Sequence, residues 1–370
     1  MIRSSRPFLL FPELKLFPFL VRHFGKKLIH FMVKSRKTVS ETRLMKLSQL
    51  LEGYGCQYIQ GNPETDVASI AYDSRRTGER SLYVCIKGFQ SNGHHYIPDA
   101  LAKGAAALIV EDVPVELPRE TVVLKVENAR NALAFVSSRY YGDLSSQMKL
   151  VGITGTRGKT STADWIGYLF DRLGLTSGVI GTKGNRIGNR TIEAVKNTKT
   201  TPESLELHGI LNQMNKEDAT HAVLEVTSHA LELGRVDFCR FETGVFTNLT
   251  PEHLDFHKSL ENYENAKLKL FRQCKCAVVN ADDPFSDKIL AVNGNAITYG
   301  IRNDADIRAM ELQLEDGTAS FTLESFGSRH FVQLKMEDDF GVYNVLTALA
   351  VCHSLGYPAH DVIPNLTKEM

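Results

Sequence analysis

The residues best suited to chemistry form one short run, Thr154-Gly155-Thr156-Arg157-Gly158-Lys159-Thr160-Ser161, between an apolar segment and a helical pattern. In such a loop, glycines let the backbone approach phosphate oxygens, and amide N–H groups at the start of the helix bind the anion. We expect Lys159 to reach the terminal phosphates of a nucleotide and the Thr160 hydroxyl to ligate Mg²⁺. The match to the common phosphate-loop pattern is imperfect, because Ile153 stands five residues before Gly158 in place of glycine. The alternative is a strand-to-helix turn that binds nothing.

Other side chains could act beside this loop. Glu225 ends an apolar run, where a charged carboxylate requires a partner or a function. His253 and His257 are four residues apart, which would place both on one helix face and suit one metal ion. Lys267 lies in a polar helical pattern, where a lysine is ordinarily solvated. Arg235 could bind a carboxylate or phosphate through its planar fork, and its alternative is a surface ion pair.

An α/β framework would position these residues. Continuous apolar runs, typical of strands buried on both faces of a parallel sheet, occur at 150–153, 177–180, 222–226, 244–247 and 277–279. Helical patterns separate them, one over Lys159–Leu173 and one that we expect to begin at Thr200-Thr201-Pro202-Glu203, with a hydroxyl cap and an early proline. This alternation predicts a doubly wound, mainly parallel sheet that binds ligands at the carboxyl ends of its strands.

Weaker patterns flank this region. Before it, strands are expected at 69–72, 81–86, 105–110 and 121–126, with helices at 96–103 and 128–141 that each end at a glycine. After residue 305, strand patterns at 308–314 and 319–324 flank a hairpin turn signal, followed by a third at 331–336 and a helix at 342–355. We therefore predict a mixed α/β domain at 45–145, and a parallel-sheet domain with a small antiparallel region at 146–366.

Composition narrows the class of protein. The chain has 370 residues, of which 43% are hydrophobic and 23% charged, as in ordinary globular proteins. The six cysteines form no CxxC pair, which favours a reducing cytoplasm, and Cys274 and Cys276 alone do not indicate zinc. Residues 1–44 carry ten Lys or Arg and two acids, a net of +8, which leaves −8 on the rest. This acidic body argues against nucleic acid as a partner.

The first 44 residues differ from the rest of the chain in composition and in the pattern of apolar residues. Charges and prolines interrupt their apolar run, so we predict neither a spanning helix nor a secretion signal, and no stable membrane insertion. They are interpreted as a basic extension that is either disordered or the product of a start codon placed upstream of the true start at Met45. The alternative is a basic targeting segment or an arm that binds a membrane surface.

Several motifs together carry a family resemblance. The loop Gly155–Ser161 resembles the TGTxGKTxT signature of the Mur ligases and their folate-polyglutamating relatives. Upstream, Tyr72-Asp73-Ser74-Arg75 and the segment 88–94 are similar to the uridine-nucleotide domain of one branch. The resemblance extends over residues 45–366, in the segments 200–203, 224–231, 234–236, 246–250, 253–257, 263–267 and 280–284.

The resemblance implies an activity. That branch adds the third stem-peptide residue, diaminopimelate or lysine, to UDP-N-acetylmuramoyl-L-alanyl-D-glutamate during peptidoglycan precursor synthesis. A carboxylate is a poor acylating agent, so ATP would convert it to an acyl phosphate that an amine attacks, with catalysis by positioning and charge neutralisation. The resemblance thus implies a cytoplasmic ligase that uses ATP and Mg²⁺, and we expect a monomer.

The resemblance also implies roles for single residues. Thr160 and Glu225 would ligate one Mg²⁺, and His253 with Lys267, as a carbamate, a second. His257 is expected to make a local hydrogen bond instead. Lys159, Glu225, His253 and Lys267 would be catalytic. ATP would be bound by Gly155, Thr156, Arg157, Gly158, Lys159, Thr160, Ser161, Asn280 and Asn344, the uridine nucleotide by Tyr72, Ser74, Phe89, Gln90 and Ser91, and the muramoyl dipeptide by Thr200, Thr201, Thr227 and Arg235.

The chain departs from the family pattern at four places. Arg157 and Lys199 each stand where most members carry Asn, and Gly341 replaces the first Asn of a family motif. Members also continue into a C-terminal ligase domain of about 130 residues, which we expect to be absent here. The alternatives are a truncated, non-catalytic relative that binds nucleotide and UDP-sugar, a folate or polyglutamate type of amide ligase, and a signalling NTPase.

Overall fold

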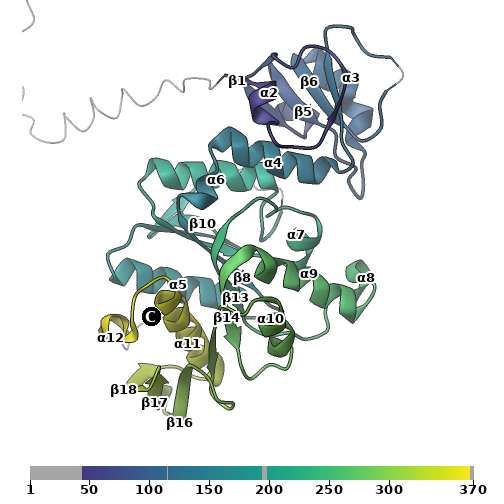
Figure 1. Cartoon of the computed structure of the whole chain (residues 1–370). Helices are drawn as coiled ribbons and strands as arrows, with labels where there is room; N and C mark the ends of the chain where they lie inside the picture. Colours follow the sequence, from purple (N-terminus) through teal and green to yellow (C-terminus); the bar gives the residue numbers. More distant parts are fainter. Residues whose placement is uncertain (1–43, 115, 194–197, 367–370) are drawn as a thin grey trace, which may run out of the picture. The chain divides into compact units, whose positions relative to one another are not determined.

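The computed structural model describes residues 44–366 except 115 and 194–197. The expected extension at 1–44, apart from its last residue, therefore lies outside the described residues. Residues from Met45 onward form one compact unit that contains two larger sheets (Figure 1). The predicted division at 145/146 falls between these sheets and stays a prediction.

The smaller sheet has five strands in the order β2-β7-β6-β5-β4. Strands β4 to β7 are parallel, and β2 pairs antiparallel with β7. All four predicted strands and both predicted helices are present. The elements of this region are β1 (Met45–Lys46), α2 (Leu47–Leu50), β2 (Gln57–Gln60), β3 (Asp66–Val67), β4 (Ser69–Ala71), β5 (Ser81–Val84), α3 (Ile97–Ala102), β6 (Ala105–Val110), β7 (Val122–Lys125) and α4 (Ala129–Tyr141).

The larger sheet has eleven strands in the order β11-β10-β9-β12-β8-β13-β14-β15-β16-β17-β18. Its parallel core runs from β9 to β16, with an antiparallel hairpin at one end and β16–β18 at the other. The strands are β8 (Lys149–Thr154), β9 (Ser177–Gly181), β10 (Gly184–Ile187), β11 (Arg190–Ile192), β12 (His221–Glu225), β13 (Phe241–Phe246), β14 (Cys274–Asn280), β15 (Ala296–Gly300), β16 (Ile307–Glu315), β17 (Thr318–Ser325) and β18 (Ser328–Lys335).

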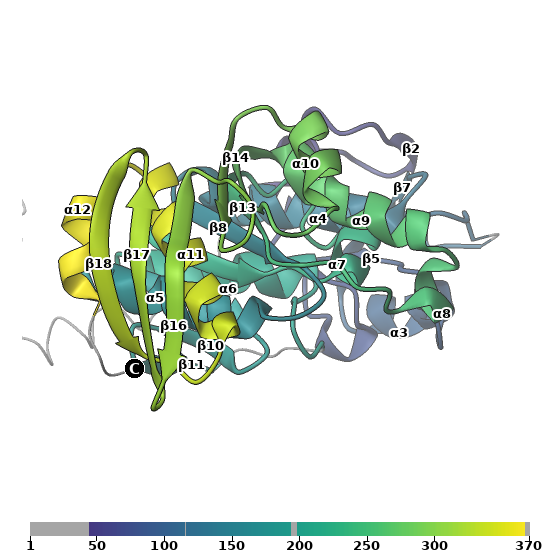
Figure 2. The ribbon, with the colours of Figure 1, turned by 90° about the horizontal axis from the view of Figure 1, so that it is seen from below.

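Helices cover both faces of this sheet (Figures 1 and 2). Alternate residues of β8 belong to different cores: Val151 and Ile153 pack with α5 and α11, whereas Leu150 packs with α6 and α9. This two-sided burial explains the continuous apolar runs of the sequence. The helices are α5 (Lys159–Arg172), α6 (Ser204–Lys216), α7 (Ser228–Glu232), α8 (Leu254–His257), α9 (Leu260–Gln273), α10 (Ser286–Val292), α11 (Asp339–Ser354) and α12 (Ala359–Val362).

The predicted start of the second helix was wrong. Helix α6 begins at Ser204, and its N-cap residue Glu203 makes no side-chain cap. The Thr201 hydroxyl donates to the carbonyl of Glu225 at the end of β12 (2.8 Å), so it binds a neighbouring strand instead of capping the helix. The hairpin β10–β11 and strand β15 were not predicted, because their short segments lack a clear apolar pattern.

The described residues contain neither a membrane-spanning helix nor a disulfide. None of their helices combines the length and the apolar character that a membrane span requires. Their six cysteines are all free thiols.

Candidate active site

The predicted phosphate loop connects β8 to α5 and depends on two glycines. Gly155 has a φ of 152°, and a Cβ there would lie 1.9 Å from the hydroxyl oxygen of Thr247. Gly158, the N-cap of α5, has a φ of 84°, in the left-handed region that favours glycine. Asn248 fastens the loop between them, accepting from the backbone N–H of Thr156 (2.8 Å) and of Arg157 (3.0 Å). The loop is therefore held in one conformation by the end of β13.

Lys159 places a cation at this loop. Its Nζ donates to the carbonyls of Gly155 (2.8 Å) and Thr156 (3.0 Å). Burial lowers the pKa of Lys159, while the nearby carboxylates of Glu225 and Glu252 oppose that shift. A phosphate in the loop would meet this amine directly.

Glu225 is buried and oriented by three hydrogen bonds. The Thr160 hydroxyl donates to it at 2.9 Å, and Thr182 donates through its backbone N–H (2.9 Å) and its hydroxyl (3.0 Å). A Cβ at Gly181 would lie 2.0 Å from the carboxylate, so glycine leaves the room that Glu225 occupies. A hydroxyl and a carboxylate side by side are hard oxygen donors, and this pair fits Mg²⁺.

Lys267 lies on α9 and is almost completely buried, with 1% of its surface exposed. Its Nζ lies 4.5 Å from the centre of the Tyr263 ring. Burial and the charge of Lys159 hold the pKa of Lys267 well below its usual range, and Glu252 opposes them. The alternative that Lys267 is an ordinary solvated lysine is therefore wrong.

The two histidines do not share a helix face. His253 precedes α8 in a left-handed conformation (φ 58°), whereas His257 ends α8. The Nε2 of His257 lies 2.9 Å from the Ser228 hydroxyl, which is the local hydrogen bond we expected. Sequence reasoning missed His229, whose ring lies 4.9 Å from that of His253 and stacks on Phe256 at 4.2 Å.

A second metal ion would need ligands other than histidine, cysteine and carboxylate side chains. Among the described residues, no three His, Cys, Asp or Glu side chains gather as a metal cluster would. An ammonium has no lone pair for a metal, so Lys267 could ligate an ion only in a form that bears oxygen.

The two asparagines expected on the adenine side lie close to the loop. The Asn280 amide donates to the carbonyl of Thr247 at 2.8 Å, and Asn344 accepts from the Thr162 hydroxyl at 2.8 Å. They join β14 and α11 to the elements that carry the loop.

The threonines expected to hold a dipeptide gather next to Glu225. The Thr201 hydroxyl accepts from the backbone N–H of Thr227 at 3.0 Å, and the hydroxyls of Thr200 and Thr182 lie 3.0 Å apart. Arg235 donates to the carbonyl of Thr201 (3.3 Å). Its Nε also lies 2.7 Å from Glu203, so Arg235 makes an ion pair, and this pair is largely buried.

The residues expected to bind a uridine nucleotide are only partly brought together. Tyr72, Ser74 and Ser91 line one cavity of about 590 Å³ at the smaller sheet. Phe89 and Gln90 are not in its wall. Phe89 is 77% exposed, and its ring lies 5.9 Å from that of Phe256.

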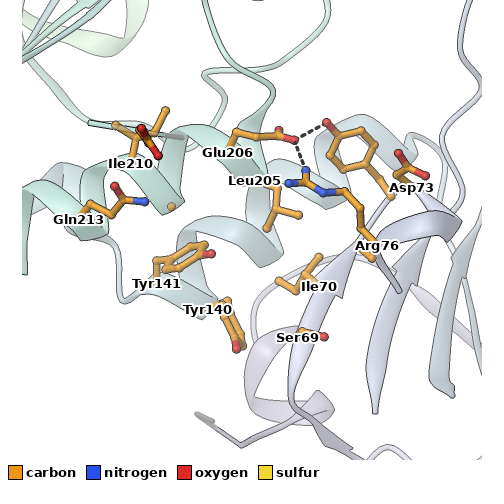
Figure 3. A pocket seen from close by; sticks show the side chains of 14 residues that line it. Ser69, Ile70, Asp73, Arg76, Tyr140, Tyr141, Leu205, Glu206, Ile210 and Gln213 are labelled. Atoms are coloured by element: carbon orange, nitrogen blue, oxygen red, sulfur yellow. Dashed lines mark hydrogen bonds and ion pairs between the residues drawn. The ribbon is translucent and has the colours of Figure 1, made fainter. Parts of the chain in front are cut away.

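A second cavity, of about 460 Å³, lies between β4, the end of α4 and one face of α6 (Figure 3). The Tyr72 hydroxyl donates to Glu206 at 2.6 Å, and Arg76 approaches the same carboxylate at 3.4 Å. Burial raises the pKa of Glu206, and the Tyr72 hydrogen bond opposes that shift. Because Tyr72 and Asp73 line both cavities, they form the wall between them.

Comparison with known proteins covers most of the described chain. The Mur ligase middle domain family matches residues 153–352, and the family described as the Mur ligase catalytic domain matches residues 66–141. The chain is 39% identical over 330 residues to the UDP-N-acetylmuramoyl-L-alanyl-D-glutamate–2,6-diaminopimelate ligase of Clostridium perfringens, which covers 87% of this chain and 67% of that protein. It is 41% identical over 324 residues to the ligase of the same name from Alkaliphilus oremlandii, with coverages of 86% and 65%.

Solved structures agree with these sequence matches. A structure of a UDP-N-acetylmuramoyl-L-alanyl-D-glutamate–2,6-diaminopimelate ligase superposes with a TM-score of 0.78 and 25% identity, covering 89% of this chain and 67% of that one. A MurF structure from Acinetobacter baumannii, at 21% identity, shares the fold with a TM-score of 0.63, covering 89% and 69%. The chain spans about two thirds of the length of the curated relatives described above.

Proposed function

This chain belongs to the Mur ligase family, and we propose that it is an ATP-dependent amide ligase of peptidoglycan precursor synthesis. Its substrates would be UDP-N-acetylmuramoyl-L-alanyl-D-glutamate and diaminopimelate, the compounds in the names of its relatives. We place this reaction in the cytoplasm, in keeping with free thiols. The observation that supports the proposal best is the buried carboxylate of Glu225 beside the Thr160 hydroxyl, next to the phosphate loop.

The loop would bind ATP and direct its terminal phosphate. Asn248 occupies the backbone N–H groups of Thr156 and Arg157, so those from Gly158 to Ser161, at the start of α5, would bind the anion. Lys159 would exchange its two carbonyl contacts for phosphate oxygens, which neutralises charge as the phosphoryl group moves to the substrate carboxylate. Asn280 and Asn344 would border the adenine side.

Mg²⁺, bound at Thr160 and Glu225, would neutralise phosphate charge during the transfer. Lys267 and His253 would form a second ion site if the buried, uncharged amine of Lys267 adds CO₂ and releases a proton to give a carbamate anion. Burial and Lys159 favour the neutral amine that this addition requires. Thr200, Thr201, Thr227 and Arg235 would hold the dipeptide so that its carboxylate faces the loop.

The test separates carboxylate activation from amide formation. The full chain is incubated with Mg·ATP and UDP-N-acetylmuramoyl-L-alanyl-D-glutamate, first with hydroxylamine and then with diaminopimelate or lysine. Hydroxylamine traps an acyl phosphate as a hydroxamate, and mass spectrometry detects both this product and a UDP-tripeptide. We expect hydroxamate with hydroxylamine and tripeptide with diaminopimelate.

Two lysine variants serve as a matched pair. Lys159→Ala should abolish phosphate release, whereas Lys183→Ala should not, because Lys183 is 76% exposed and pairs with Asp164 on the surface. Hydroxamate without tripeptide would show that this chain activates the carboxylate but does not complete the amide. Absence of both products, or equal phosphate release from the two variants, would contradict the proposal. If UDP-tripeptide forms with lysine but not with diaminopimelate, the amino acid substrate is lysine.

A further inference from the structure

Two arginines share one buried carboxylate at the wall of the 590 Å³ cavity. The Nη1 of Arg130 donates to both oxygens of Glu203, at 3.2 and 3.3 Å, and the Nε of Arg235 lies 2.7 Å from one of them. The three side chains are only 19%, 10% and 15% exposed, in the order Arg130, Glu203, Arg235. Two guanidinium groups and one carboxylate leave this buried cluster with one uncompensated positive charge.

The neighbouring acids do not remove that charge. Asp73, in the same wall, is bound by Arg75 at 2.7 Å. Glu206 is paired with Arg76 at 3.4 Å. Asp99 also lines the cavity, but it is exposed and solvated. A buried charge is costly unless it is paired, so the excess favours an anionic ligand at this wall.

Arg130 is the member of the cluster that reaches the cavity. It lines the cavity together with Ser74 and Ser91, while Arg235 does not belong to the lining. A guanidinium has five N–H donors, and Glu203 is bonded to those of Nη1, so Arg130 keeps donors for a second acceptor.

We propose that Arg130 binds the diphosphate of a nucleoside diphosphate in this cavity, through the guanidinium N–H groups that Glu203 does not occupy. The proposal rests on the proposed function, because it takes the ligand to be the UDP portion of the substrate. Arg130 is thereby a substrate-binding residue outside the motifs that carry the family resemblance.

A purely structural role is the competing explanation. Helix α4 is already joined to the segment after α7 by the hydrogen bond from Asn131 to Asp237 (2.8 Å) and by the rings of Phe135 and Phe238, whose centres are 5.1 Å apart. Arg130 could be one more such contact. Removing a contact of this kind would weaken the fold without distinguishing a diphosphate from a nucleoside.

Calorimetric titration of the full chain with UDP and, separately, with uridine distinguishes the two roles. We expect Arg130→Met to weaken UDP binding by about tenfold, as for the loss of a charge-assisted hydrogen bond, and to leave uridine binding unchanged. The matched control is Arg139→Met, on the same helix but outside this cavity, which should bind both ligands like the wild type. Glu203→Gln should tighten UDP binding, because it removes the shared negative charge.

Several outcomes would overturn the proposal. These are equal losses for UDP and uridine in Arg130→Met, no loss for either, or weaker UDP binding in Glu203→Gln. If Arg130→Met does not fold, as judged by circular dichroism, Glu203→Gln alone decides. Ligase product from the wild type together with any of these results would refute the role of Arg130 and leave the proposed function intact. Failure of the wild type to bind UDP would refute both.

Discussion

Lys267 shows how burial changes the chemistry available to one residue. Its side chain is enclosed next to the Tyr263 ring, where burial outweighs the opposing charge of Glu252. An ammonium in such a place is costly, so the neutral amine is favoured. A neutral amine is a nucleophile, which an exposed lysine at neutral pH is not.

We therefore expect Lys267 to react with CO₂ at neutral pH. Carbon-13 NMR of the protein with labelled bicarbonate should show a carbamate signal, and this signal should be missing in Lys267→Gln. Lys269→Gln is the control, because Lys269 lies on the same helix and is 43% exposed, paired with Glu232. A signal of equal strength in wild type and Lys267→Gln would contradict the prediction.

The backbone of Arg157 is held by hydrogen bonds, whereas its side chain is largely exposed to solvent. Thr247 and Asn248 donate to its carbonyl at 2.7 and 3.1 Å, while its side chain is 77% exposed and 3.7 Å from Glu252. An exposed pair of this kind contributes at most about 1 kcal/mol to stability. The guanidinium can therefore turn towards a bound phosphate with little effect on the fold.

We expect Arg157→Asn to fold normally and to raise the KM for ATP by about threefold to tenfold, with a smaller effect at high salt. Steady-state phosphate release at two ionic strengths measures this. Arg329→Asn on β18, 66% exposed and paired with Glu324, is the control. An unchanged KM would mean that Arg157 does not contact the nucleotide.

Helix α6 and its N-cap residue Glu203 carry buried titratable groups. Glu203 and Glu206 reach residues of the smaller sheet region, and His208 lies in the core with no exposed surface. Burial lowers the pKa of His208 to about 4, and only Asp143 opposes the shift. The folded chain therefore keeps this histidine neutral at a pH where the unfolded chain protonates it.

The stability of the chain should fall as the pH is lowered from about 6.5 to 4, by up to about 1.4 kcal/mol per pH unit from His208. The sign follows because the unfolded state binds more protons in this window, so the contribution is complete above 6.5. Urea denaturation at pH 7.5, 6.0 and 5.0 should show a shallower decline in His208→Gln than in wild type. The control is His360→Gln, which is 72% exposed; equal slopes in all three proteins would refute the assignment.

The sequence predicted an element correctly where the residues of that element alone determine its structure. The apolar runs predicted β8, β9, β12, β13 and β14, because strands covered on both faces need no alternation. The start of α6 was not predictable in this way. The Thr201 hydroxyl has two competing acceptors, the helix N–H groups and the carbonyl of Glu225, and only the fold brings the second one near.

The same distinction, between local sequence and packing, applies to the residues of the candidate site. The loop and Glu225 could be predicted, because a strand end followed by Gly155, Gly158 and Lys159 has a local signature. Packing between α9, α7 and the segment before α8 determines two further features: the burial of Lys267 and the contact of the His229 ring with His253. The spacing of these residues along the chain does not predict either feature.

At the scale of the whole molecule, α6 and α4 join the two sheet regions. The contacts include Arg130 with Glu203, Asn131 with Asp237, and the Tyr72 hydroxyl with Glu206. Each places a polar group of the smaller region on an element of the larger one. The stability of the compact unit should therefore depend on these few buried polar contacts.

Tyr72→Phe should lower the free energy of unfolding by about 1 kcal/mol, because it removes a donor from a buried carboxylate. Urea denaturation at neutral pH measures this difference. Tyr58→Phe serves as the control, since Tyr58 is 40% exposed on β2 and should change stability little. Equal effects of the two substitutions would show that the 2.6 Å hydrogen bond does not stabilise the joint.

The strand order also sets the timing of assembly on the ribosome. Strand β8, which leads into the phosphate loop, is completed on its two sides by β12 and β13. At a synthesis rate of about 5–20 residues per second, β12 emerges roughly 70 residues, or several seconds, after β8, and β13 later still. During that interval the apolar residues 150–153 have neither of their strand neighbours. We therefore expect both edges of β8 to stay unpaired until β12 and β13 have been synthesised.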